Sequence, residues 1–351
     1  MKRVVATLLG LFFAVVAGWA SDLEVHFVDV GQGSGVVLRT EQAVVVVDAG
    51  ATSTMADYLS RLGVTTVDLV VASHAHADHI GGIPFLFDRF AIGRLWYNGQ
   101  SHTTRTFERF LDAILASQAD YQEPERGQSV TFGELILTVL HPAGSAAEYQ
   151  GHLHDRNIVI RADYRLFSVI LTGDAEVRAE QEMRATGVRL RATVLQLGHH
   201  GSQTSSSAAF LRAVQPAVVV YQAGIDNSYA HPHVAVIERV GAATSAAIYG
   251  TDTHGSIVIV TDGRTYRIET ARTAPPRPRV PTIAETGCVD INTASVSELT
   301  RIVHIGEQRA HQIVAERPFA GVDDLRRISG IGEARLRDIR DQGLACAVGL
   351  F

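Results

Sequence analysis

Most of the chain alternates between short strand-like runs and helical segments. Residues Leu23–Val30 alternate apolar and polar side chains, the period of a strand with one buried face. Ala43–Val47 and Leu69–Ala72 are almost wholly apolar and rich in valine, which predicts strands buried on both faces. Phe107–Ser117 has helical spacing instead. Further strands are predicted at Glu134–Leu140, Asn157–Tyr164, Leu166–Thr172, Val194–Leu197, Ala217–Tyr221 and Ser256–Thr261. Strands interleaved with helices predict an α/β sandwich in which helices cover two sheets.

The first 20 residues have the pattern of an export signal. An apolar run from Val4 to Ala20 follows two basic residues and ends in small side chains, as in a secretory signal peptide. The alternative is a retained membrane anchor, since 17 apolar residues lie at the short limit for a spanning helix. We expect cleavage, a secreted or periplasmic protein, and no stable membrane insertion afterwards.

The remainder divides into three parts. Residues 22–271 carry the strand-rich pattern and form the large unit. Residues 272–287 are rich in proline and arginine, which predicts an extended linker. Residues 288–351 contain four short helical patterns and no strand, and form a small all-α unit.

Composition excludes several classes of protein. With 46% hydrophobic residues and a net charge of -6, the chain is not largely disordered. The large unit has a net charge of about -9 and the small unit one of about -1, which argues against an unselective polycation. Two cysteines allow at most one disulfide within the chain.

The strongest chemical signal is a histidine-rich loop at residues 73–79. It follows an apolar strand and places three imidazoles and one carboxylate within six residues. This set suits zinc or manganese, whereas an ordinary polar surface loop is the alternative. Alternate residues His74 and His76 can converge on one ion, while Asp78 and His79 can reach a second.

Two later strand ends complete the candidate set. Asp174 ends an apolar strand in the sequence Leu-Thr-Gly-Asp, and we predict that it bridges both ions, although Gly-Asp pairs also mark turns. Gly-His-His-Gly at residues 198–201 ends another strand. One of these histidines is expected to be a ligand and the other a proton donor or outer partner. We favour His200 as the ligand and His199 as the proton donor or outer partner.

Together these blocks resemble the metallo-β-lactamase fold, and within it the soluble domain of ComEC-type DNA-uptake proteins. The resemblance covers nearly all of residues 23–270. Its other matching stretches are Asp29–Gly33, Val47–Gly50, Thr204–Ser206, Asn227–His233 and Thr251–Gly255. It implies a four-layer αβ/βα sandwich with two divalent ions at the edge of the sheets, zinc first and manganese as the alternative.

The sequence departs from the ComEC pattern at two places. His76 stands where those domains often have aspartate, which brings this chain nearer the general hydrolase pattern. Ahead of the strand before Asp174, an asparagine-rich turn is replaced by a stretch containing His152 and His154. Either could be the third imidazole of the first ion, and we favour His154; a surface histidine pair is the alternative.

The ligand set implies hydrolysis. Two divalent ions about 3.5–4 Å apart can activate water at neutral pH and hold the oxygens of a phosphodiester transition state. The catalytic candidates are Asp78, His199 and His231, of which a histidine would protonate the leaving oxygen. Candidate phosphate contacts come from Ser202, Thr204, Ser205 and Ser206, a stretch that equally fits a cap for the helix predicted at Ala208–Val214.

The small unit contains an internal repeat that points to DNA. Ile302–Gly306 and Ile328–Gly332 lie 26 residues apart, each between two helical patterns. A glycine turn at a helix start exposes backbone N–H groups to a phosphate. Residues 289–345 resemble the tandem helix-hairpin-helix of ComEA-type DNA receptors. The resemblance implies DNA contacts at Ile305, Gly306, Gly330, Ile331 and Gly332.

Other features of the small unit qualify this interpretation. His304 replaces the usual glycine of the first hairpin, and the small net charge predicts modest, salt-dependent DNA affinity. The alternative is a protein-interaction module.

Two local features of the small unit predict how it is stabilised. Ser295 and Glu298 have the spacing of a capping box. Cys288 and Cys346 lie at the two ends of the unit, and in an exported chain they predict a disulfide rather than two free thiols.

The sequence therefore predicts an exported, metal-dependent phosphodiesterase or nuclease that acts on DNA, in DNA uptake or in degradation of extracellular DNA. DNA and other DNA-uptake components are the expected partners. One alternative is a hydrolase of another phosphoester or of a β-lactam, the latter less favoured because the usual Gly-His-Thr-Xaa-Gly loop is absent. The other is a DNA receptor without catalysis.

Overall fold

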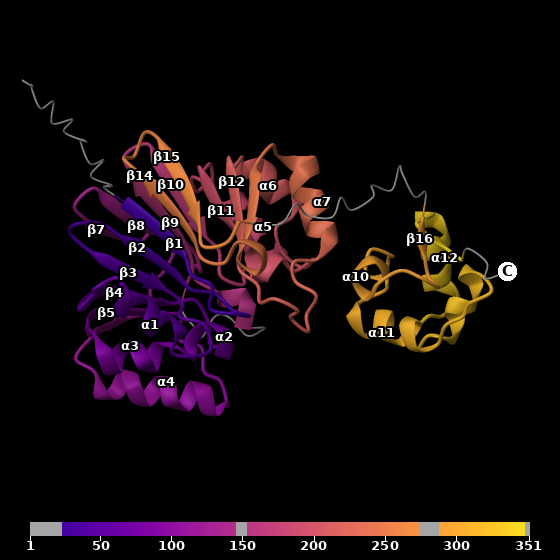
Figure 1. Ribbon diagram of the computed structural model, residues 1–351, viewed down its shortest axis with the longest axis horizontal. Helices are drawn as coiled ribbons and strands as arrows, with labels where there is room; N and C mark the ends of the chain where they lie inside the picture. The colour runs from indigo at the N-terminus through magenta and orange to yellow at the C-terminus, as the bar shows by residue number, and fades with distance from the viewer. Residues whose placement is uncertain (1–22, 145–152, 274–287, 348–351) are drawn as a thin grey trace, which may run out of the picture.

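The computed structural model describes residues 23–144, 153–273 and 288–347 (Figure 1). The predicted signal peptide, most of the predicted linker and His152 lie outside these ranges. Among the described residues, no helix combines the length and the apolar character needed to cross a bilayer.

The large unit contains two β-sheets. The eight-stranded sheet has the order β15-β14-β1-β2-β3-β4-β5-β6. Its strands are β1 (Leu23–Phe27), β2 (Val36–Arg39), β3 (Val44–Val47), β4 (Thr66–Ala72), β5 (Ala91–Tyr97), β6 (Asp120–Gln122), β14 (Ile257–Thr261) and β15 (Tyr266–Thr270). The seven-stranded sheet has the order β13-β12-β11-β10-β9-β8-β7. Its strands are β7 (Ser129–Phe132), β8 (Leu135–His141), β9 (Val159–Tyr164), β10 (Phe167–Leu171), β11 (Val194–Gln196), β12 (Val218–Tyr221) and β13 (Ala247–Gly250).

Helices cover the outer face of each sheet (Figure 1). Along the chain, the helices that come between strands of the first sheet are α1 (Thr54–Arg61), α2 (Ala77–Ile80), α3 (Ile83–Arg89) and α4 (Arg105–Ala116). Those that come between strands of the second sheet are η2 (Leu153–Arg156), α5 (Val177–Ala185), η3 (Gly198–Gly201), α6 (Ala208–Val214) and α7 (Val234–Ala243). Helix α8 (Thr251–His254) precedes β14.

Three apolar layers explain the valine-rich strands. Val45 and Val47 of β3 pack between the two sheets, whereas Val46 points into the core under the helices of the first sheet. In β12, Val218 and Val220 face the layer between the sheets while Val219 faces helices α5–α7. Strands buried on both faces need apolar side chains at every position. The predicted four-layer sandwich is confirmed, with strand ends shifted by a few residues.

His141 is a fully buried histidine at the end of strand β8. Its Nδ1 atom lies 2.7 Å from the carbonyl oxygen of Asn157. Its Nε2 atom lies 3.3 Å from Glu182 Oε2. The histidine therefore belongs to the sheet, where a backbone carbonyl and a carboxylate face its ring.

The small unit has a hydrophobic core of its own. It contains β16 (Val289–Asp290), α10 (Val296–Leu299), α11 (Glu307–Ala315), η4 (Val322–Arg327), α12 (Glu333–Gln342) and β17 (Ala345–Cys346). The predicted capping box is present, because Ser295 and Glu298 each bond the backbone N–H of the other. The predicted disulfide joins Cys288 to Cys346.

The prediction that the small unit has no strand is wrong. β16 and β17 pair in parallel next to the disulfide, with Val289 opposite Ala345 and Asp290 opposite Cys346. Two residues per strand are too few to show an alternating pattern in the sequence.

Candidate metal centre

The loops that follow parallel strands of both sheets meet at one edge of the sandwich. Strands β3, β4 and β5 run parallel in the first sheet, and β10 to β13 run parallel in the second. Carboxyl ends of parallel strands commonly form ligand sites. Asp48 follows β3, the histidine loop follows β4, Asp174 follows β10 and the His-His pair follows β11.

Two groups of side chains at this edge have the composition of metal sites and share no residue. The first contains His74, His76, His154 and Asp174, and the second contains Asp78, His79 and His200. A third possible group, His154, Glu176 and His199, shares His154 with the first. In each group the possible ligand atoms all lie within 4.8 Å of one another. Apart from His152, the predicted ligands are thus all brought together, and the structure places His200 rather than His199 in the second group.

Asp174 lies between the two groups and faces both. Its Oδ1 atom is 3.1 Å from His79 Nε2 and 3.5 Å from His200 Nε2. Its Oδ2 atom is 3.7 Å from the Nε2 atoms of both His74 and His154. One carboxylate oxygen is directed at each group, which is the geometry that a bridging ligand requires.

The spacing of the donor atoms fits an ion in each group. His76 Nδ1 lies 2.9 Å from His74 Nε2 and 3.1 Å from His154 Nε2. His200 Nε2 lies 3.3 Å from His79 Nε2 and 3.2 Å from Asp78 Oδ2. Ligands about 2.0–2.1 Å from a tetrahedral zinc lie roughly 3.3 Å from each other. The His/Asp clusters therefore fit a dinuclear metal site.

Outer partners hold most of the ligand rings in place. Nδ1 of His200 lies 2.9 Å from the Gln222 carbonyl oxygen, and Nδ1 of His154 lies 3.2 Å from Glu176 Oε1. Nδ1 of His74 lies 3.1 Å from Ser73 Oγ. Metal-binding histidines usually donate their second ring N–H to such an oxygen, which fixes the tautomer that binds metal.

Asp48 is a further partner of a ligand ring, and the sequence did not single it out as a site residue. It is fully buried and adopts a left-handed backbone, with φ at 57°. Its Oδ2 atom lies 2.7 Å from His79 Nδ1 and accepts the hydroxyl of Ser73 at 2.8 Å. A carboxylate at the end of a valine-rich strand was the available sequence signal.

We expect Asp48→Asn to weaken metal binding in the second group by about 10- to 100-fold, because it removes the charge that orients His79. The asparagine retains the size of the side chain and tolerates the left-handed backbone. Calorimetric titration with a divalent metal measures the change in affinity. An affinity equal to that of the wild type would contradict the role assigned to Asp48.

The electrostatics of the site leave several carboxylates ionised in a buried setting. Burial opposes the charged form of Asp174, but the neighbouring His79 and His200 hold its pKa well below the ordinary value. Burial also opposes ionisation of Asp78, yet His79 and a hydrogen bond with His200 lower its pKa to about 2. Buried carboxylates of this kind need paired cations or metal ions.

His199 lies at the border of the first group and is held by Glu176. Glu176 Oε1 is 3.2 Å from the Nδ1 atoms of both His154 and His199, and it accepts the Thr204 hydroxyl at 2.9 Å. Burial opposes the charged form of His199, but the hydrogen bond with Glu176 and the negative charges of Asp174 and Glu176 together raise its pKa. Glu176 is the second site residue that sequence reasoning missed.

Two features of the backbone shape this edge. Gly173 has φ at +50°, and a Cβ atom there would lie 2.6 Å from Asn157 Oδ1, the atom that accepts the N–H of Asp174. His199 and His200 both adopt left-handed φ values, 50° and 56°. Successive non-glycine residues in this region are strained, and such strain clusters at functional sites.

The predicted phosphate contacts at Ser205 and Ser206 are not available in the structure. Both residues are buried, and the backbone N–H groups of Ser206 and Ser207 donate to the carboxylate of Glu180. Ser207 caps α6, since its hydroxyl accepts the N–H of Phe210. Ser205 and Ser206 thus lead into the start of α6. Ser202 and Thr204, whose hydroxyls lie 3.1 Å apart, stay predicted phosphate contacts.

An open pocket of about 360 Å³ gives access to the two groups. It is lined by Gln32, Ala75, His76, Ala77, Asp78, His102, Thr104, Asp174, His199, His200, Tyr229 and His231. His231 is buried, with its ring centroid 5.6 Å from that of His199 and 6.0 Å from that of His200. All three predicted catalytic residues therefore line one pocket.

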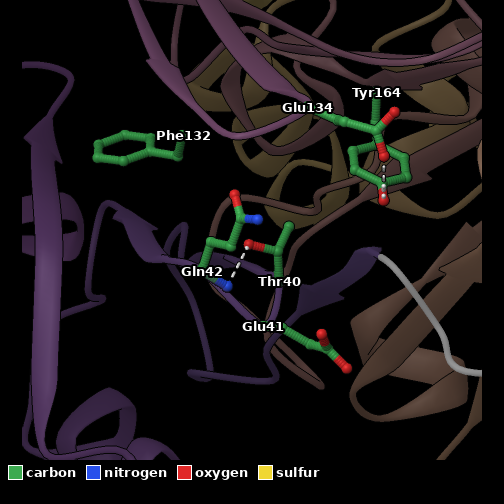
Figure 2. Close-up of a pocket in the computed structure, with 6 residues that line it drawn as sticks. All are labelled: Thr40, Glu41, Gln42, Phe132, Glu134 and Tyr164. Atoms are coloured by element: carbon green, nitrogen blue, oxygen red, sulfur yellow. Dashed lines mark hydrogen bonds between the residues drawn. The ribbon is translucent and has the colours of Figure 1, made fainter.

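A second, smaller pocket lies between the turn after β2 and the second sheet (Figure 2). Its volume is about 100 Å³, and its polar groups bond one another: the Gln42 N–H donates to the Thr40 hydroxyl and Tyr164 donates to Glu134. None of its six lining residues is a histidine. It has no features of a metal site.

In the small unit, the predicted DNA contacts divide into two kinds. Ile305 and Ile331 are buried in the core, and their N–H groups donate within the turns to Ile302 and Ile328. Gly306 and Gly332 are the N-cap residues of α11 and α12, and Gly330 has φ at +79°. Any phosphate contact therefore depends on the glycines and the helix starts.

Comparison with protein families identifies both units. The model of the metallo-beta-lactamase superfamily matches residues 28–224, which include the histidine loop, Asp174 and the His-His pair. This chain belongs to the metallo-beta-lactamase superfamily. A helix-hairpin-helix motif matches residues 285–342. Both matches confirm the resemblances inferred from the sequence.

Among members of the superfamily, the chain is similar to competence proteins. ComE operon protein 3 of Bacillus subtilis is 27% identical over 259 residues, which cover 68% of this chain and 33% of that protein. Competence protein ComA of Neisseria gonorrhoeae is 31% identical over 224 residues, 61% of this chain and 29% of that protein. The chain thus spans about a third of the length of these relatives.

Two further similarities extend the comparison. A protein named deoxyribonuclease from Thioalkalivibrio sp. is 55% identical over 62 residues, 18% of this chain and 17% of that protein. Among solved structures, the metallo-beta-lactamase fold protein YhfI from Bacillus subtilis aligns with a TM-score of 0.47 at 12% identity, covering 71% of this chain and 100% of that one.

Proposed function

We propose that this protein is an exported, metal-dependent nuclease that cleaves phosphodiester bonds of DNA, in DNA uptake or in degradation of extracellular DNA. The observation that carries the proposal is that one chain joins a two-group His/Asp site to a helix-hairpin-helix unit. The competence proteins and the deoxyribonuclease among its relatives support DNA as the substrate. Other DNA-uptake components are the proposed partners.

The two groups of ligands would hold two divalent ions with Asp174 between them. We favour zinc, with manganese as the alternative, because both accept imidazole and carboxylate ligands. When bound, the ions would supply Lewis-acid stabilisation of the phosphate and would make water a stronger nucleophile at neutral pH. The residues of the chain supply orientation and proton transfer.

His199 is the best placed residue to protonate the leaving oxygen. Glu176 binds its Nδ1 atom, which turns Nε2 toward the pocket, 3.7 Å from Asp174 Oδ2. His231 is the second candidate, since it lines the same pocket beside His199. Asp78, also at the pocket wall, is proposed to orient the attacking water and accept its proton.

The small unit would hold the DNA backbone independently of sequence. Its glycine N-caps, Gly306 and Gly332, begin two helices whose first N–H groups suit phosphate oxygens. Arg309 links the two hairpins, because its guanidinium donates to the carbonyl oxygens of His304 and Ser329. Binding through phosphates predicts an affinity that falls as salt concentration rises.

Cleavage of labelled single-stranded and duplex DNA by the metal-reconstituted full chain tests the proposal. We expect cleavage that requires added zinc or manganese and that the double substitution His76→Ala/Asp78→Ala abolishes, because each group of ligands then loses a member. Asp112→Ala, which removes an exposed carboxylate on α4, is the matched control and should cleave as the wild type does.

The contrary result is equally clear. Metal-loaded wild type that binds DNA in a salt-sensitive manner through residues 288–351, but cleaves neither form, would replace the nuclease by a DNA receptor. Hydrolysis of small phosphodiesters without cleavage of DNA would move the substrate to another phosphoester.

A further inference from the structure

The loop beside the metal centre presents an exposed aromatic ring to the pocket. Tyr229, between β12 and α7, lines the pocket together with Asp174 and His200. Its ring stacks on that of the buried His231, with centroids 5.7 Å apart and planes inclined by 20°. Tyr229 is nevertheless 53% exposed, so about half of its surface remains open beside the candidate metal ligands.

Asn227 holds this loop in one conformation. Its side-chain oxygen accepts the N–H groups of Tyr229 at 3.2 Å and His231 at 3.0 Å. Its amide donates to the carbonyl oxygens of Gly224 at 2.9 Å and His231 at 2.7 Å. Gln32, at the pocket wall, accepts the N–H of Gly224 at 3.1 Å. The ring is therefore presented on a preorganised support, which lowers the entropic cost of binding a ligand.

The pocket offers little positive charge for a nucleic acid. None of its 12 lining residues is lysine or arginine, and the large unit is acidic overall. Proteins that bind single strands combine basic grooves with aromatic rings on which bases stack. The lining of this pocket has no such basic residue, so an aromatic platform would supply the contact with the nucleoside.

We propose that Tyr229 is a stacking platform for one unpaired nucleobase next to the cleaved phosphodiester, so that the site takes single-stranded DNA in preference to intact duplex. This inference rests on the proposed nuclease function. A base can lie flat on the exposed ring only after it has left the stack of a duplex, which costs free energy that a single strand does not require. The pocket, at about 360 Å³, suits one small group rather than a helix.

Single strands that carry one abasic nucleotide at successive positions test the inference with the metal-loaded full chain. We expect the abasic site to lower kcat/KM of the wild type by between about 5-fold and 150-fold at one position beside the cleaved bond. Tyr229→Ala should lose a similar factor on normal DNA and show no further loss with the abasic strand. Tyr229→Phe should keep the discrimination, because phenylalanine retains the ring.

Tyr266→Ala is the matched control, since it removes a ring that is 39% exposed on β15. It should discriminate against the abasic strand as the wild type does. A 2-aminopurine base at the sensitive position gives a second readout, because stacking quenches its fluorescence. Quenching is expected with the wild type and Tyr229→Phe, but not with Tyr229→Ala.

The outcomes separate this inference from the nuclease proposal. Metal-dependent cleavage that is equal for normal and abasic strands would overturn the stacking platform and leave the nuclease intact. Absence of cleavage by the wild type would overturn the nuclease, and the 2-aminopurine signal would then decide the platform alone. Quenching that persists in Tyr229→Ala would overturn it.

Discussion

Asp174→Asn is expected to lower metal-dependent cleavage by roughly 1000-fold and the metal content from two ions to at most one per chain. Each oxygen of Asp174 faces one group of ligands, at 3.1 Å from His79 and 3.7 Å from His74. Asparagine leaves the shape of the site intact but supplies one oxygen and no charge. Losing the joint action of two ions removes several kcal/mol of transition-state stabilisation, which corresponds to about that factor in rate.

Metal content from elemental mass spectrometry and cleavage of a labelled strand measure the two effects on the same preparation. Asp112→Asn, on the exposed surface of α4, is the matched control and should keep both values. Two bound ions and an unchanged rate in Asp174→Asn would show that Asp174 does not bridge.

Cys288→Ser is expected to destabilise the small unit by about 4 kcal/mol, because the disulfide closes a loop with a sequence separation of 58 residues. A helical unit of this size has a small core and little reserve of stability. We therefore expect it to unfold near physiological temperature without the bond, and DNA binding through this unit to be lost.

Thermal unfolding of the full chain measures this change. The unfolding transition of the small unit is expected to move to a lower temperature in Cys288→Ser. Cys346→Ser should have the same effect, and a reductant should reproduce it in the wild type. Hydrolysis of a small phosphodiester at the metal centre is the internal control, because the ligands lie in the other unit. A transition that neither substitution moves would contradict a stabilising role for the disulfide.

The sandwich could be predicted because its strands are buried on both faces. The valines of β3 and β12 alternate between two apolar layers, so an unbroken apolar run indicates the layering directly. The metal-binding loop could also be predicted, since its histidines and its aspartate lie within six residues. Local patterns of this kind are properties of the sequence itself.

The missed features depend on contacts between distant segments. Asp48 reaches His79 across 31 positions, and Glu176 joins His154 to His199. Ser206 had the composition of a phosphate contact, but Glu180 on α5 takes its N–H group. Only the packing of strands and helices brings these pairs together, so the spacing of residues in the sequence does not predict these contacts.

The pairing of β1 with β14 constrains how the large unit can be made. Leu23, at the start of the first strand, lies opposite Thr261, 238 residues later. Contacts of such long range slow folding, because much of the chain must be ordered before they form. A nascent chain that ends before β14 leaves one edge of β1 without its partner, and such edges promote aggregation. The first sheet can therefore be completed only after nearly all of the large unit has been synthesised.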